Sequence, residues 1–258
     1  YSQEGINTKA ELLLDSLLIY FPGDMDILFA RANAQYSAQN WTNFLKTYQD
    51  IYEIDPHQNE ILIKIYEIGV ATGNIELVRD ILWELKSISQ SQLILELLIK
   101  ISNSSGEYSE GITLMYELIE TTGSTDDQII NLSQLHLRLE KFDEVGDILS
   151  PIYEKGNHSL DVLRMLLIAY SSLGQIENEI NVSKTLMNEY SDIPVGYEAL
   201  SFAYLQAGSN EKAVEILLQA LPKFPDEVTF SFSLATIFYN SGDYLKAENY
   251  FHRALTIQ

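Results

Sequence analysis

The sequence predicts an all-α fold: an α-solenoid in which antiparallel helical hairpins stack one after another. Two observations support this prediction. Apolar residues recur at helical spacing along nearly the whole chain. Single glycines mark a repeat of 33 or 34 residues, with Glu140 replacing one marker; they are Gly73, Gly106, Gly174, Gly208 and Gly242. Self-similarity at this period is typical of arrays in which each hairpin buries its apolar face against its neighbours.

The expected hairpins start at residues 25, 59, 92, 126, 160, 194 and 228, and each reads as helix, short turn, helix. The block from 228 shows this most clearly. Leu234, Ala235 and Phe238 share one face of its first helix, and a turn follows at Ser241–Asp243. Its second helix carries Tyr244, Ala247, Phe251 and Ala254 at helical spacing. The block from 194 repeats the pattern with Tyr197, Leu200, Tyr204, Gly208, Ala213, Leu217, Ala220 and Pro225.

These residues resemble the tetratricopeptide repeat family, whose signature is W-x2-L-G-x2-Y, then A-x3-F, then P. Small residues such as Ala213 and Ala247 let the two helices of a hairpin approach closely, and Tyr204 and Phe238 fill the space beside them. The resemblance implies a right-handed superhelix whose first helices line a concave groove. It also implies that the chain binds other proteins and carries out no chemistry itself.

The other hairpins match the signature less closely. The blocks from 59, 92, 126 and 160 carry leucine, isoleucine and valine at the small and aromatic positions, so the glycine spacing sets their register. Pro56 and Pro225 follow second helices, because proline cannot continue a helix. The block from 25 is intermediate, with Gln35 where tyrosine is usual and with Ala32, Trp41, Phe44, Tyr48 and Ile51 in place.

Residues 1–24 fit the same register as the second half of one further repeat, which would act as a partial repeat or capping helix. Tyr1 and Gly5 then occupy the tyrosine and turn positions, and Pro22 closes the helix. The expected domain organisation is one array over residues 1–258. Because a lone helix needs a neighbour for its apolar face, we expect residues before Tyr1 and a longer protein. The uncapped ends leave homo-oligomerisation open.

Composition excludes several classes of function. The chain has no cysteine, which rules out disulfides, thiolate catalysis and cysteine–zinc sites. No apolar run reaches the ~18 residues of a membrane span. The net charge of −21 disfavours nucleic-acid binding, because an acidic surface repels phosphates. The family's inner-surface positions carry seven acidic and four basic residues here, so most of the excess acid is expected on the outer face.

The sequence offers no catalytic, cofactor or metal motif. His57, His136, His158 and His252 are not spaced to share a metal ion, and His136 is expected to pack in the core. No glycine-rich phosphate loop occurs. Acidic residues after turns, including Glu177 and Glu179, are typical of helix starts, where the helix dipole favours negative charge. We therefore predict a non-enzyme without a cofactor or a bound metal.

The groove implied by the resemblance supplies the candidate binding residues. Its first part is aromatic and polar, its middle is charged, and its last part is apolar. Exposed aromatic groups would suit an apolar peptide or helix; packing by neighbouring helices is the alternative. The family's carboxylate clamp is not expected, because Glu67 and Glu96 would repel a carboxylate. The candidates are Phe29, Asn33, Tyr36, Lys64, Lys100, Arg138, Phe202, Leu205, Phe232 and Tyr239.

Three functional hypotheses follow. The first is a non-catalytic scaffold that binds a peptide or helix of a partner protein, as part of a larger bacterial protein of the cell envelope or of a multiprotein assembly. The second is the substrate-recognition arm of an enzyme whose catalytic domain lies outside this chain. The third is an architectural part of an envelope complex. The compartment stays open between periplasm or cell envelope and cytoplasm, although a cysteine-free chain suits an oxidising periplasm.

Overall fold

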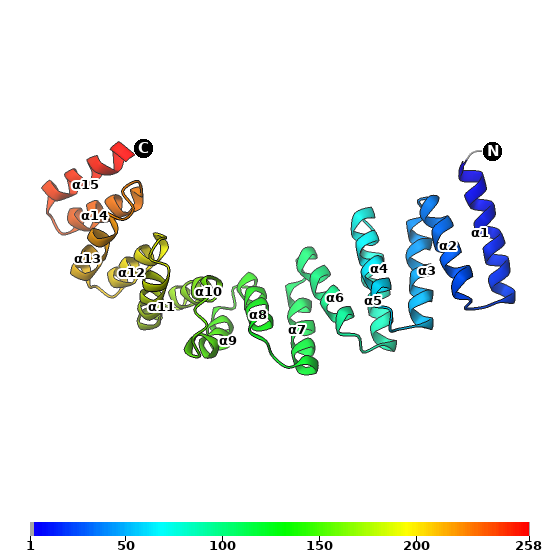
Figure 1. Ribbon diagram of the computed structural model, residues 1–258. Coiled ribbons are helices and arrows are strands. Elements are labelled where there is room, and N and C mark those ends of the chain that lie inside the picture. The colour runs from blue at the N-terminus through cyan, green and yellow to red at the C-terminus, as the bar shows by residue number, and fades with distance from the viewer. Residues whose placement is uncertain (1–2, 258) are drawn as a thin grey trace. The chain divides into compact units, whose positions relative to one another are not determined.

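The computed structural model describes residues 3–257, which form helices and connecting turns and no strand (Figure 1). The predicted all-α solenoid of helical hairpins is therefore confirmed. The helices are α1 (Gln3–Tyr20), α2 (Met25–Ser37), α3 (Trp41–Ile54), α4 (Asn59–Thr72), α5 (Ile75–Ile88), α6 (Gln92–Ser105), α7 (Tyr108–Thr122), α8 (Asp126–Arg138), α9 (Phe142–Glu154), α10 (Leu160–Ser172), α11 (Ile176–Glu189), α12 (Val195–Gln206), α13 (Asn210–Ala220), α14 (Val228–Asn240) and α15 (Tyr244–Ile257).

The helices gather into two compact units. Unit 1 runs to Ser124 and contains α1 to α7, and unit 2 begins at Thr125 and contains α8 to α15. Within each unit, every helix packs against the next one along the chain. The even-numbered helices from α2 to α14 are the first helices of the hairpins, and each starts at the expected boundary or one residue after it. The single array over residues 1–258 stays a prediction.

A left-handed turn ends the first helix of every hairpin. The glycine markers all have positive φ, for example 74° at Gly73 and 82° at Gly242. Glu140 has a φ of 55°, so it adopts the same conformation in place of the missing glycine. Gln39 also has a φ of 55° and completes the series in the first hairpin, which the sequence did not indicate. A side chain at such a φ is strained by about 1–2 kcal/mol, which explains why glycine is used elsewhere.

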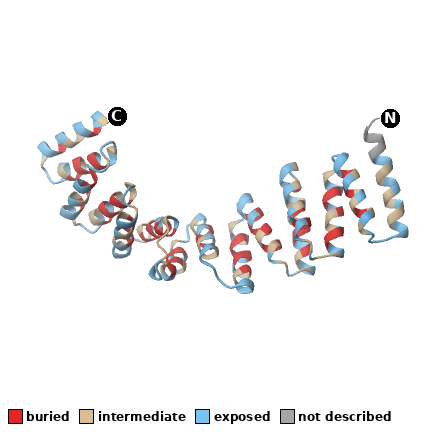
Figure 2. Ribbon diagram, in the orientation of Figure 1, coloured by how far each residue is buried: buried red, intermediate tan, exposed pale blue. Residues whose placement is uncertain are grey.

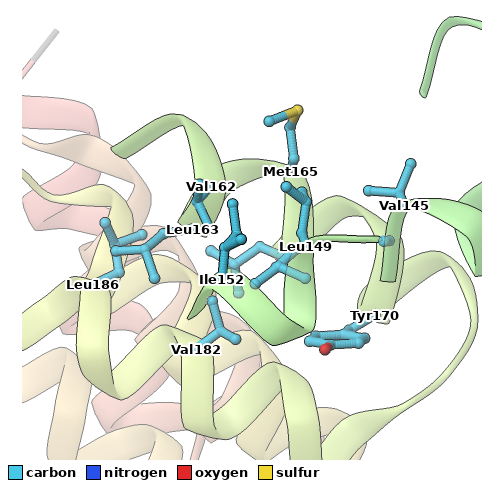
Figure 3. Close-up of a cluster of buried hydrophobic side chains, with 12 residues drawn as sticks. Val145, Leu149, Ile152, Val162, Leu163, Met165, Tyr170, Val182 and Leu186 are labelled. Atoms are coloured by element: carbon cyan, nitrogen blue, oxygen red, sulfur yellow. The ribbon is translucent and has the colours of Figure 1, made fainter. Parts of the chain in front are cut away.

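Buried residues occur along the helices of both units (Figure 2). Unit 1 buries Phe44 and Tyr52 almost completely. In unit 2, one cluster joins α9, α10 and α11 (Figure 3), and the hydroxyl group of Tyr170 lies 2.7 Å from Ser150 Oγ at its edge. A second cluster surrounds Phe230 on α14. His136 is buried as predicted, and burial lowers its pKa.

The N-terminal register was partly wrong. Helix α1 already runs through Gly5, so no turn forms there, and Tyr1 lies outside the described residues. Helix α1 nevertheless packs against α2. The fully buried Gln35 of α2 donates a hydrogen bond to Glu11 Oε1 over 3.0 Å and accepts one from Thr47 over 2.8 Å. These two bonds satisfy the glutamine that replaces the usual tyrosine.

Within residues 3–257, no helix is both long and apolar enough to cross a bilayer. Across the same residues, no three histidine or carboxylate side chains gather in a way that could hold a metal ion.

Candidate functional site

The groove candidates of unit 1 form an aromatic and polar strip on α2. Tyr36 is 47% exposed, although its ring meets that of Trp41 edge-on with centroids 5.2 Å apart. Phe29 is half-buried with its ring edge against Tyr48, and Asn33 is exposed. The sequence therefore identified one exposed aromatic side chain here and one that mainly packs.

The charged candidates lie on three different first helices. Lys64 on α4 is half-buried, and Lys100 on α6 and Arg138 on α8 are exposed. None of the three takes part in an ion pair found within residues 3–257. Lys100 and Arg138 therefore present their positive charges to solvent.

Unit 2 contains an open cleft of about 830 Å³. Side chains of the first helices α10, α12 and α14 line it, together with single residues of α11 and α13. Its apolar wall is partly exposed, with Ile168 at 46% and Phe202 at 53%. Leu205 also belongs to this wall. Such a concave, mainly apolar surface with a few polar groups is the usual form of a ligand site.

The apolar candidates of unit 2 line this cleft or smaller hollows. Leu205 also lines a smaller hollow of about 350 Å³ with Phe232, which is 56% exposed. Tyr239, at the end of α14, lies in a separate hollow of about 400 Å³ with Phe251 of α15. The structure therefore brings Phe202, Leu205 and Phe232 onto adjoining surfaces, whereas Tyr239 borders a different one.

Among the cleft residues that were not sequence candidates, such as Ile168, the most unusual is Glu179. It lies in the first turn of α11, as a helix-start acid would, but it is only 2% exposed and lines the cleft. Its Oε2 atom is buried and has no hydrogen-bond partner among the residues that the structure describes. Burial raises the pKa of this carboxyl, and a hydrogen bond from the Ser171 side chain opposes the shift. The repeat register did indicate that this position is unusual. The equivalent positions 34 and 68 residues later carry the small apolar residues Ala213 and Ala247, where this hairpin carries a carboxylate.

Glu179→Gln is expected to raise the free energy of unfolding by about 1 kcal/mol at neutral pH, because the amide buries no negative charge. The folded chain binds the Glu179 proton more tightly than the unfolded chain, since burial raises the pKa above its ordinary value of 4.5. This proton's contribution to stability is fully present below pH 4.5 and is lost as the pH rises through the folded-state pKa. The advantage of the variant should therefore grow with pH.

Urea unfolding of the wild type and the variant, below pH 4.5 and at neutral pH, measures this difference. Glu177→Gln is the matched control, because Glu177 lies two residues earlier on α11 and is exposed. Because this variant removes an exposed charge, it should not gain stability at neutral pH. A stability difference for Glu179→Gln that does not change with pH would contradict the assignment of a costly buried charge.

Comparisons with known proteins agree with this architecture. A family model described as tetratricopeptide repeat matches residues 3–59 and 199–258. The crystal structure of MamA superposes with a TM-score of 0.55 at 15% identity, over 60% of this chain and 91% of that one. MamA from Desulfovibrio magneticus RS-1, residues 41 to the end, gives 0.57 at 12% identity, over 66% and 96%. These likenesses concern the fold alone. No curated protein matches the chain in sequence.

Proposed function

Because the chain is a tetratricopeptide repeat protein, we propose that it is a binding scaffold and that unit 2 captures a peptide segment of a partner protein in the cleft between α10, α12 and α14. The fold is typically a protein–protein interaction scaffold. The observation that supports this site is the open cleft of about 830 Å³ with apolar side chains turned toward solvent on successive first helices.

The chemistry of the cleft suits a protein segment. Burial of exposed apolar groups such as Ile168 and Phe202 against a partner side chain is favourable, because it removes them from water. Large aromatic groups contribute disproportionately to the affinity of protein interfaces. Phe232 extends the apolar surface through its shared neighbour Leu205. On this proposal Phe202, Leu205 and Phe232 anchor the partner, and Arg138 and Tyr239 contribute at further positions of unit 2.

Selection of random linear peptides on the purified protein tests this proposal. The selected peptides should bind the double variant Phe202→Ala/Phe232→Ala at least roughly tenfold more weakly, because truncating a buried aromatic anchor removes more than about 1 kcal/mol. Binding is measured by fluorescence anisotropy with labelled peptides.

The matched control is Leu218→Ala. Leu218 is an exposed apolar residue of α13 in the same unit and does not line the cleft, so its variant should bind like the wild type. Helix content by circular dichroism must be unchanged in all variants. Equal binding by the wild type and the double variant, or loss of helix content in the double variant, would contradict the assignment of the two phenylalanines to a binding surface.

A further inference from the structure

The cleft contains a carboxylate that its surroundings leave unsatisfied. Glu179 is 2% exposed, and its buried Oε2 atom finds no hydrogen-bond donor within residues 3–257. The Ser171 side chain donates a hydrogen bond to this carboxyl group, but leaving its second oxygen buried without a donor is unfavourable, because that atom has lost its water. The strongly matching hairpins place alanine at this position of the repeat, at Ala213 and Ala247, so helix packing does not require a carboxylate here.

The other charged groups of the cleft do not neutralise this carboxylate. Glu198 also lines the cleft and accepts a hydrogen bond of 2.6 Å from the Thr229 hydroxyl group. Arg164 is the cationic residue among those that line the cleft, but it is exposed and forms no ion pair found within the described chain. Two carboxylates thus face one guanidinium group in a mainly apolar hollow.

We propose that the partner segment places a lysine or arginine side chain in this cleft, where its cationic group binds the Glu179 carboxylate while neighbouring apolar residues of the segment cover Ile168 and Phe202. This inference rests on the proposed function and specifies the chemistry of its ligand. A cationic donor supplies the hydrogen bond that Oε2 lacks and brings the charge of the cleft to balance. The apolar wall strengthens the interaction, because the attraction between charges increases as water is excluded.

The arrangement also provides specificity. A segment that carries an acidic group would be repelled by Glu179 and Glu198, and a wholly apolar segment would leave Oε2 without a donor. Only a segment with both apolar and cationic side chains satisfies the wall and the carboxylate together.

Peptides selected on the purified full chain provide the test. We expect one enriched lysine or arginine flanked by apolar residues. Replacing that residue with its neutral isostere, norleucine for lysine or citrulline for arginine, should weaken binding to the wild type at least roughly tenfold. The same replacement should change binding to Glu179→Gln much less, because the variant has already lost the charge that the cation contacts.

Two further variants complete the design. Glu179→Ala removes the carboxyl entirely and should keep the fold, since the equivalent positions Ala213 and Ala247 are alanine. It should be as insensitive to the neutral peptide as Glu179→Gln. Glu177→Gln removes an exposed charge outside the cleft and should respond like the wild type.

The outcomes separate this inference from the proposed function. Peptides that depend on Phe202 and Phe232 but contain no enriched basic residue would overturn the inference and leave the peptide-binding function intact. An equal loss on neutral replacement for the wild type and for Glu179→Gln would do the same. Failure to select any peptide whose binding requires Phe202 and Phe232 would overturn both.

Discussion

Phe230→Ala is expected to destabilise unit 2 by about 3–5 kcal/mol, the usual loss when a fully buried phenylalanine is truncated. Phe230 has no exposed surface and lies within the cluster that includes Leu217 and Leu234. Its ring centroid is 6.0 Å from that of Phe224. Removing the ring leaves a cavity that the packed helices α13 and α14 can fill only in part. Because single domains are stable by only about 5–15 kcal/mol, this is a large share of the total.

Phe232→Ala is the matched control. Phe232 follows two residues later on α14 but is 56% exposed, and its ring meets Phe251 only edge-on with centroids 5.8 Å apart. Its truncation should cost no more than about 1 kcal/mol. Urea unfolding followed by circular dichroism compares the two variants under identical conditions. Similar losses for Phe230→Ala and Phe232→Ala would show that the second ring also belongs to the core, and would weaken its assignment as a binding residue.

Gly196→Ala is expected to cost about 3 kcal/mol, at the upper end of the range for overpacking. A methyl group on Gly196 would lie 2.6 Å from both the Cα and the N atom of Met187. These are backbone atoms of α11, so no side-chain rotation can make room, and α11 and α12 must move apart. These two helices form the boundary of the cleft that contains Glu179 and Phe202, so the variant should also bind the selected peptides less tightly.

Gly146→Ala is the control that separates the cost of a steric clash from the effect of replacing a helical glycine by alanine. Gly146 lies inside α9, and a methyl group there would meet Tyr170 Cε1 at 3.5 Å, an ordinary contact. Alanine favours the helix by up to about 1 kcal/mol over glycine, so this variant should be as stable as the wild type or slightly more so. Thermal unfolding of both variants distinguishes them, and a midpoint for Gly196→Ala at or above the wild-type value would contradict the close approach of α11 to α12.

Local signals made the fold predictable. The spacing of the glycines and the apolar periodicity set the start of each first helix within one residue, because both depend on the backbone conformation of a short segment. Gly5 shows the limit of this reasoning: its register suggested a turn, but no local feature interrupts α1 there. Gln39 shows the opposite error: the backbone forms a left-handed turn there, but the position carries no glycine from which the turn could be predicted.

The site was less accessible to sequence reasoning, because burial depends on neighbours that are distant along the chain. Phe230 and Phe232 have the same chemistry and lie two residues apart, yet one is fully buried and the other is more than half exposed. Glu179 follows a turn as Glu177 does, and only the packing of α11 against α10 and α12 distinguishes them. Comparison with Ala213 and Ala247 in the repeat register was the one sequence signal that set Glu179 apart.

The left-handed turn that ends every first helix also affects how such a protein can change over evolutionary time. The turn positions with positive φ carry glycine in five hairpins and a strained side chain in two, at Gln39 and Glu140. None of these turn residues lines the cleft. A single exchange between glycine and another residue changes the stability of one hairpin by about 1–2 kcal/mol. Selection can therefore adjust the robustness of each hairpin separately while the residues that choose the partner remain unchanged.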